Sequence, residues 1–340
     1  MNNITKKTTG LVLGKFMPFH KGHQLLITFA NNFVEQLYVV VDPIKNELIP
    51  VEKRGKWLKQ TIPEMEVLYL TKYHPQDPGE DPNFWQIWQE SLLSIIPEKL
   101  DYVFASEKYG FKLAEVLDAQ FIPVDLKRET VPISATKIRE NTAQYWDYLT
   151  DIVKQDCLMR VCIFGAESTG KTTLCQQLAS YFNTVYVPEY ARFFIETKVN
   201  FNQKDLIDIA KGQIALEKAL TPKANKILFS DTDPLATTIW SQWLFNSCPQ
   251  EIINLANQKH YDFYLLTDID LEWEADKVRY FPEKRTEFMT SCINSLEVNN
   301  RPYFIINGRG KTRLENAIKI ISIKLNDHLD KLFTNANIYI

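Results

Sequence analysis

The feature that most constrains the fold of this sequence is an alternation of short apolar runs with helical patterns, which occurs twice. In the first half, "LVLG" (Leu11–Gly14) precedes a stretch with apolar residues at helical spacing, and "QLYVVVD" follows it. Two parallel strands need a crossover connection between them, so this order predicts a parallel βαβ unit.

Further strands are predicted at "MEVLYL", "DYVFAS", "FIPVD", "RVCIFG", "TVYVPE", "KILFSDT", "YDFYLLTD" and "PYFIING", with helical stretches between them. We therefore predict an α/β chain of two doubly wound parallel-sheet domains, residues 1–152 and 153–340. The join is expected within 149–159. The polar segment 271–300, between two predicted strands, is interpreted as a candidate mobile lid.

Composition narrows the class of protein. The 340 residues are 45% hydrophobic and carry a net charge of −3 without a block of like charges, which argues against a nucleic-acid partner or a polybasic anchor. There is no long apolar run and no signal core, so we expect no membrane insertion and a cytoplasmic location. Five cysteines without a C-x-x-C pair favour reduced thiols. The sequence leaves the oligomeric state open, a homo-oligomer included.

The strongest motif lies in the second half. "GAESTGKT" (Gly165–Thr172) matches G-x-x-x-x-G-K-[ST], follows a predicted strand and opens a predicted helix. In such a loop the backbone N–H groups converge on phosphate oxygens, the lysine reaches the terminal phosphates and the hydroxyl holds Mg²⁺. The predicted ATP contacts of this loop are Gly165, Glu167, Ser168, Thr169, Gly170, Lys171, Thr172 and Thr173.

Three carboxylates follow other predicted strands of this half. Asp231 and Asp233 end "KILFSDT" and its turn, and Glu189 lies in "VPEYAR". We interpret Asp231 as a catalytic metal ligand beside Thr172, Asp233 as a substrate contact and Glu189 as a catalytic carboxylate; which of the three is the base stays open. Two alternatives without a catalytic role stay open. Each aspartate could cap the following helix, and Glu189 could form a surface ion pair with Arg192.

Two arginines of the candidate lid, Arg279 and Arg285, could clamp phosphates during transfer, although plain solvated charge fits them equally well. No convincing guanine-reading N-K-x-D motif is found, and the half is short for a motor. A kinase for a small acceptor therefore fits best.

The first half carries "GKFMPFHKGH" (Gly14–His23) at a strand-to-helix turn. His20 and His23 lie near the positive end of the following helix, where imidazoles can donate hydrogen bonds to phosphate oxygens without forming a covalent intermediate. The predicted ATP contacts of this turn are Gly14, Lys15, Phe16, His20 and His23.

A second phosphate-binding element is predicted at "PISATKIRE" (132–140). Ser134 and Thr136 offer hydroxyls at the start of a helix, and Arg139 lies one turn on. As a plain helix start this segment needs no function; beside the histidine motif it is interpreted as part of the same site.

H-x-G-H with I-S-x-T-x-x-R resembles the nucleotidyltransferase superfamily. With the second-half motif, the chain is similar to the bifunctional nicotinamide mononucleotide adenylyltransferase/ribosylnicotinamide kinase family, the NadR type. The resemblance covers nearly the whole chain and includes "FASEKYG", "VDLKRETVPISATKIREN", "VPEYAR", "SDTDPLAT" and "LLTDID".

The resemblance implies two reactions, each with Mg²⁺ and ATP. The second domain would phosphorylate ribosylnicotinamide, and the first would join nicotinamide mononucleotide to AMP, giving NAD and pyrophosphate. It implies aromatic nicotinamide sites, with candidates Trp85 and Trp88 in the first domain and Tyr190 and Trp240 in the second. The tryptophan spacing in "FWQIWQE" also fits a buried helix face.

The chain departs from the family pattern in two places. The D-G-x-R element of related kinases reads "ADKVR" (275–279) here, which keeps Asp276 and Arg279 without the glycine. Longer members begin with a repressor domain, and with the first predicted strand near Leu11 DNA repression is not expected. Two alternatives stay open: an adenylyltransferase and kinase for a flavin or pantetheine acceptor, and a nucleotide sensor without turnover.

Overall fold

A computed structural model describes residues 7–45, 47–198, 201–258, 261–274 and 282–334. The chain divides into two compact units. The first unit is Met1–Asp156 with the segment from Leu329 on, and the second unit is Cys157–His328. The predicted domain limits at 152 and 153 stay a prediction.

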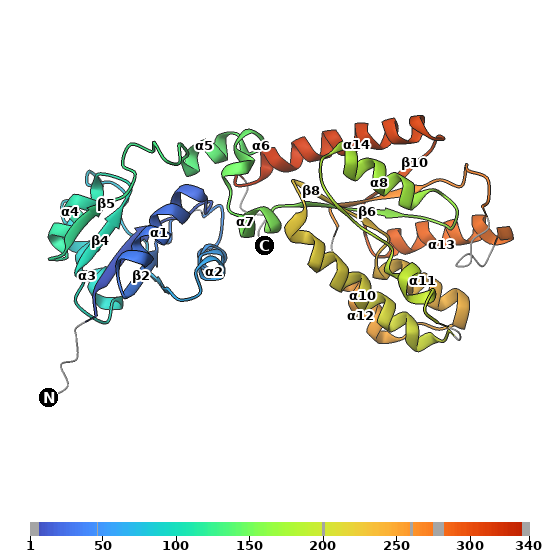
Figure 1. The fold of residues 1–340 in the computed structure, drawn as a ribbon, viewed down its shortest axis with the longest axis horizontal. Coiled ribbons are helices and arrows are strands. Elements are labelled where there is room, and N and C mark those ends of the chain that lie inside the picture. The colour runs from blue at the N-terminus through green and yellow to red at the C-terminus, as the bar shows by residue number, and fades with distance from the viewer. Residues whose placement is uncertain (1–6, 46, 199–200, 259–260, 275–281, 335–340) are drawn as a thin grey trace. The chain divides into compact units, whose positions relative to one another are not determined.

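The first unit holds a parallel sheet of five strands in the order β3-β2-β1-β4-β5 (Figure 1). Its strands and helices are β1 (Thr9–Gly14), α1 (Lys21–Phe33), β2 (Gln36–Val41), α2 (Val51–Thr61), β3 (Glu66–Tyr69), α3 (Phe84–Ile95), β4 (Tyr102–Ala105), α4 (Tyr109–Val116), β5 (Gln120–Pro123), α5 (Ala135–Glu140), α6 (Thr142–Tyr145) and α7 (Asp151–Asp156). All five strands predicted in this half are confirmed.

Apolar side chains cover both faces of this sheet, because neighbouring residues of a strand point to opposite sides. Val103 of β4 belongs to a core with Trp88 and Leu92 of α3. The next residue, Phe104, contacts the rings of Phe29 and Phe33 of α1. Helices therefore lie on both faces, and the loops after the strands meet at one edge of the sheet.

The second unit repeats this design with the strand order β10-β9-β6-β8-β7. Its elements are β6 (Met159–Phe164), α8 (Lys171–Tyr181), β7 (Tyr186–Val187), α9 (Tyr190–Ile195), α10 (Gln203–Leu220), β8 (Ile227–Asp231), α11 (Pro234–Phe245), α12 (Gln250–Asn257), β9 (Phe263–Thr267), α13 (Arg285–Val298), β10 (Tyr303–Ile306) and α14 (Lys311–Lys331). The predicted fold class of two doubly wound parallel sheets is confirmed.

The candidate lid is wrong over Arg285–Val298. Within 271–300 the structure places α13, whose Phe288, Cys292 and Leu296 are buried in the core below β6 and β9. These residues recur every four positions, so one face of a charged segment is apolar. Residues 275–281, with Asp276 and Arg279, lie outside the described part of the chain.

Within the described ranges, no helix combines the length and the apolar character needed to cross a bilayer.

Close packing at Gly110 yields a stability prediction. A Cβ atom on this α4 glycine would meet the ring of Phe121 and lie 2.8 Å from the Cβ atom of Ala105. We expect Gly110→Ala to destabilise the first unit by up to about 2 kcal/mol, because an overpacking cost of about 1–3 kcal/mol exceeds the gain in helix propensity of about 1 kcal/mol. Hydrogen exchange of the β4 amides measures the change.

Gly79→Ala is the matched control, because the added Cβ atom at this exposed position would meet one aspartate oxygen at 3.1 Å. An unchanged or raised stability of Gly110→Ala would contradict the packing of α4 on the sheet.

Candidate functional site

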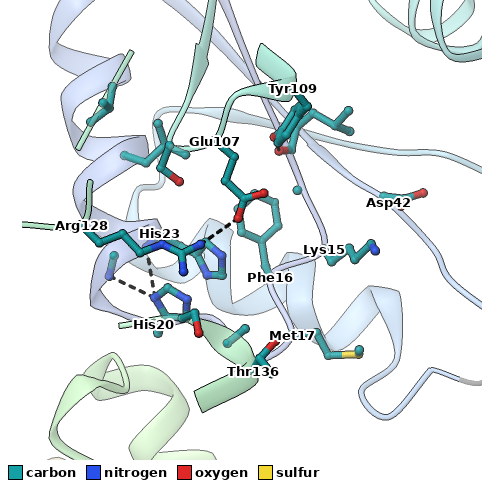
Figure 2. A pocket seen from close by; sticks show the side chains of 18 of the residues that line it. Lys15, Phe16, Met17, His20, His23, Asp42, Glu107, Tyr109, Arg128 and Thr136 are labelled. Carbon is teal, nitrogen blue, oxygen red and sulfur yellow. Dashed lines mark hydrogen bonds and ion pairs between the residues drawn. The ribbon is translucent and has the colours of Figure 1, made fainter. Parts of the chain in front are cut away.

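The first unit contains a cavity of about 690 Å³ at the carboxyl edge of its sheet, shown in Figure 2. The turn after β1 supplies one wall and the start of α5 another, so residues far apart in sequence meet. Every first-unit residue predicted to bind ATP or substrate lines this cavity: Gly14, Lys15, Phe16, His20, His23, Trp85, Trp88, Ser134, Thr136 and Arg139.

His20 caps helix α1 with its ring. Its Nδ1 atom accepts hydrogen bonds from the backbone N–H groups of Gly22 at 3.1 Å and His23 at 3.3 Å. Because Nδ1 is an acceptor, the proton of the neutral ring must lie on Nε2. The helix cap therefore fixes the tautomer that leaves Nε2 as a donor.

The two imidazoles are stacked, with ring centroids 3.7 Å apart. Burial lowers the pKa of His20 to about 3, and the charges of Arg128 and Arg139 act in the same direction. Burial also holds the pKa of His23 well below its usual range, helped by His20 and Arg128 and opposed by the Pro18 carbonyl. Both rings are therefore neutral hydrogen-bonding groups at pH 7.

The α5 element supplies the opposite side of the histidine turn. The Ser134 hydroxyl accepts a hydrogen bond from the Lys137 N–H at 3.3 Å and so caps the helix. Arg139 donates to the Met17 carbonyl and, at 3.1 Å, to the Thr136 hydroxyl. The guanidinium thus joins the two predicted phosphate-binding segments in one site.

Arg128 and Glu107 are site residues that the sequence did not reveal. Arg128 lines the cavity near His20 and His23, and its guanidinium forms an ion pair with Glu107 at 2.8 Å (Figure 2). Asp125 fixes this loop by accepting three backbone hydrogen bonds at 2.9–3.1 Å. In the sequence, Asp125 is the last residue of the predicted strand "FIPVD", a position where aspartate often begins a turn.

The two candidate tryptophans differ. The Trp88 indole is buried, donates to the Pro75 carbonyl at 3.0 Å and packs on His74. Trp85 is half-buried and packs edge-on against Phe84. The indole N–H of Trp88 thus bonds the protein itself. Trp85 is therefore the better candidate for stacking on a flat ligand ring.

In the second unit, the Gly165–Thr172 loop joins β6 to α8. Gly165 has φ +139, and a Cβ atom there would lie 2.7 Å from the Thr267 hydroxyl, so only glycine suits the position. Lys171 donates to the carbonyls of Gly165 and Ala166 at 3.1 and 2.8 Å. Its ammonium group is therefore already held over the loop.

The predicted metal ligands face each other. The Thr172 hydroxyl donates to Asp231 Oδ2 at 2.5 Å, and Asp231 Oδ1 is buried without a hydrogen-bond partner among the described residues. Burial and the charge of Glu189 raise the pKa of Asp231, which Lys171 opposes. Glu189 forms an ion pair with Arg192 at 3.0 Å.

A small cavity of about 80 Å³ lies beside this loop. It is lined by Gly165, Glu167, Ser168, Lys171, Glu189, Asp233 and Trp240, together with apolar residues of α9, α10 and α11. Thr169 and Gly170 complete the loop, and Thr173 is exposed in the first turn of α8.

Asp233 has structural contacts as well as a place in this cavity. It caps α11 and accepts a hydrogen bond from Tyr264 at 2.8 Å, while burial raises its pKa to about 6. Tyr190 does not line the cavity; its ring lies against Gly212 of α10. Trp240 is thus the aromatic candidate that the structure brings to the site.

Arg313 holds the phosphate loop, and the sequence did not predict this role. The buried guanidinium donates to the Thr169 carbonyl, to the Gly308 carbonyl at 2.8 Å and to the Asp270 carboxylate. Arg285 likewise donates to the Ser168 carbonyl at 3.1 Å. Both arginines bond the protein side of the loop, so they position it.

Comparison with known proteins supports both halves. A model described as "Cytidylyltransferase-like" matches residues 11–141, and one described as "AAA domain" matches residues 160–313. The "Trifunctional NAD biosynthesis/regulator protein NadR" of Escherichia coli (strain K12) is 29% identical over 318 residues, which cover 87% of this chain and 78% of that protein. The protein of that name from Salmonella typhimurium is 27% identical with the same coverage.

Two solved structures share the fold. "Crystal structure of NadR protein in complex with NR" has a TM-score of 0.72 at 23% identity and covers 93% of this chain and 96% of that chain. "Crystal structure of NadR protein in complex with NAD and AMP-PNP" has a TM-score of 0.69 at 24% identity and covers 94% and 96%.

The depressed pKa values of the histidines yield a pH prediction. A histidine that is neutral in the folded state and titrates normally when unfolded stabilises the fold above pH 6.5, and this stability is lost as the pH falls toward the folded pKa. Between pH 7 and pH 5, the protonation of one such ring in the unfolded state lowers the free energy of unfolding by about 2 kcal/mol.

We therefore expect His20→Asn, which keeps an acceptor for the α1 cap, to reduce the loss of unfolding free energy between pH 7 and pH 5 by about 2 kcal/mol. Hydrogen exchange of the β1 amides at the two pH values measures it. An equal loss in the variant and the parent protein would contradict a neutral, buried His20.

Proposed function

The chain belongs to the NadR type of two-domain enzyme, and from that premise we propose how its two units make NAD. The second unit phosphorylates ribosylnicotinamide with ATP, and the first unit adenylylates the resulting nicotinamide mononucleotide with a second ATP. One observation carries the proposal: each unit has its own phosphate-binding turn, one built on Lys171 and one on His20 and His23.

In the first unit, a phosphate oxygen of the mononucleotide attacks the α-phosphorus of ATP, and the bond to the leaving pyrophosphate breaks. The Nε2–H group of His20 donates a hydrogen bond to an oxygen of the phosphate under attack, and the neutral His23 ring stacks on His20 in the same site. Arg139, Ser134 and Thr136 bind the leaving phosphates. We include Arg128 as a further donor near the same rings.

In the second unit, the 5′-hydroxyl of ribosylnicotinamide attacks the γ-phosphorus of ATP, and the bond to the leaving ADP breaks. Lys171 follows the transferred phosphate, and the loop amides bind the others. Glu189 and Asp233 line the adjacent cavity, where a carboxylate can accept the hydroxyl proton. Trp240 offers a flat surface there for the pyridinium ring.

The residues beside Lys171 fit a divalent cation. Hard cations such as Mg²⁺ prefer carboxylate and hydroxyl oxygens, and Thr172 with the unpartnered Asp231 Oδ1 atom offers both. Bound with ATP, Mg²⁺ would neutralise charge on the β- and γ-phosphates. The cytoplasmic location and the absence of a nucleic-acid partner remain part of this proposal.

The two activities are expected to be separable. Lys171→Ala should lower the kinase rate about 10²–10³-fold and leave adenylylation of nicotinamide mononucleotide unchanged, because the two ATP sites use different turns. His23→Ala should lower adenylylation by a similar factor and leave the kinase unchanged. Each rate is measured separately with purified protein, as mononucleotide formed and as NAD formed.

Loss of both activities in either folded variant would contradict independent sites. Nucleotide binding by the parent protein without turnover would favour the sensor alternative. Efficient turnover of a flavin or pantetheine acceptor alone would replace the pyridine assignment.

Removing the proposed metal ligand should change the metal dependence of one activity. We expect Asp231→Asn to raise the Mg²⁺ concentration needed for half-maximal kinase rate about tenfold or more, because a charged ligand becomes neutral. Asp208→Asn, on the exposed face of α10, is the matched control. A kinase rate with an unaltered Mg²⁺ profile would remove Asp231 from the metal site.

A further inference from the structure

The cavity of the first unit has a second end that the phosphate chemistry does not use. In Figure 2, Asp42 lies on the opposite side of the pocket from His20 and Arg128. Gln76 bonds Asp42 there, and Trp85 lines the same cavity. A carboxylate and an amide thus share one corner of a cavity that also contains an indole.

The orientation of the Gln76 amide is fixed by its partners. Its Nε2 atom donates to Asp42 Oδ2 at 3.0 Å and to the His74 carbonyl at 3.0 Å. Both partners are acceptors, so the amide nitrogen must face them and cannot exchange places with the oxygen. Gln76 Oε1 makes no hydrogen bond with any described residue, and the exposed side chain lines the rim of the cavity.

Asp42 puts a negative charge beneath this amide. The residue follows directly after β2, has only 2% of its surface exposed, and its Oδ1 atom has no hydrogen-bond partner within the described ranges. The charges of Lys15 and Arg54 act on this carboxyl group, while Nδ1 of His74 lies 4.0 Å away on a ring whose pKa is lowered by burial. Burial raises the pKa of Asp42 to about 6, so the carboxyl group is mainly ionised at pH 7.

Trp85 lines the same cavity with a partly exposed indole. A flat cation gains from stacking on such a ring and from a carboxylate within the same low-dielectric pocket. An acceptor oxygen at the edge of the ring selects a substituent that carries N–H groups.

We propose that Asp42 and Gln76, beside Trp85, form the part of the adenylyltransferase site that accepts a pyridinium mononucleotide bearing a carboxamide and rejects one bearing a carboxylate. This inference rests on the proposed function of the first unit. The carboxamide N–H group donates to Gln76 Oε1, while a carboxylate meets that oxygen and the Asp42 charge and is repelled.

Asp42 acts on this choice in two ways. Its charge disfavours a second carboxylate, and its hydrogen bond holds Gln76 in the accepting orientation. Asparagine at position 42 would remove the charge and could itself donate a hydrogen bond. The Gln76 amide could then rotate and exchange the positions of its oxygen and nitrogen.

The test is adenylylation of nicotinamide mononucleotide and of nicotinic acid mononucleotide, each with saturating ATP. We expect the parent protein to favour the carboxamide by at least about 100-fold in kcat/KM. Asp42→Asn and Gln76→Ala should each lower this ratio at least about tenfold, through the KM of the mononucleotide, with the KM for ATP unchanged. A purely structural role would lower both rates together and leave the ratio in place.

Gln86→Ala is the matched control, because this glutamine lies on the exposed side of α3 and bonds only Glu90. If Asp42→Asn does not fold, Gln76→Ala at its exposed position decides the question. A ratio within twofold of the parent value in folded Gln76→Ala overturns the inference.

Equal turnover of both mononucleotides by the parent protein also overturns the inference and leaves the adenylyltransferase function intact. Turnover of neither mononucleotide would end the proposed function of the first unit, and the inference with it.

Discussion

Hydrogen-bonding groups of the backbone must find partners where a central strand turns into the first helix of each unit. In the first unit, His20 meets this need with its own Nδ1 atom, which receives two N–H groups of α1. In the second unit, Lys171 donates hydrogen bonds to two carbonyls of the loop before α8. Each solution leaves a donor at the carboxyl edge of the sheet, and both proposed ATP sites follow from that.

The sequence predicted what depends on neighbouring residues. Strands, crossover helices and both phosphate turns are local patterns, and the structure contains each of them. The long-range contacts of the supporting arginines were not predictable in this way. Arg313 bonds the Thr169 carbonyl across 144 positions of sequence, and Arg139 bonds the Met17 carbonyl across 122. A contact of that kind depends on the tertiary fold, and one sequence carries no signal for it.

Ambiguous patterns account for the remaining differences. The spacing of "FWQIWQE" fits a buried face and a binding surface, and the structure uses it for both, since Trp88 is buried while Trp85 stays partly open. The candidate lid failed for a related reason. Averaged over 271–300 the segment is polar, but the stability of α13 depends on the few apolar positions that face the core.

The two phosphate sites differ in charge, and the difference suits their reactions. A lysine binds the polyphosphate strongly and can follow the γ-phosphate as it moves to the acceptor. Neutral imidazoles add no net charge, so their interaction gains most where charge builds up on the phosphorus in the transition state. A cationic pair at the same place would also bind pyrophosphate tightly and slow its release. Burial of His20 and His23 thus costs stability below pH 6.5 and keeps the site selective for the transition state.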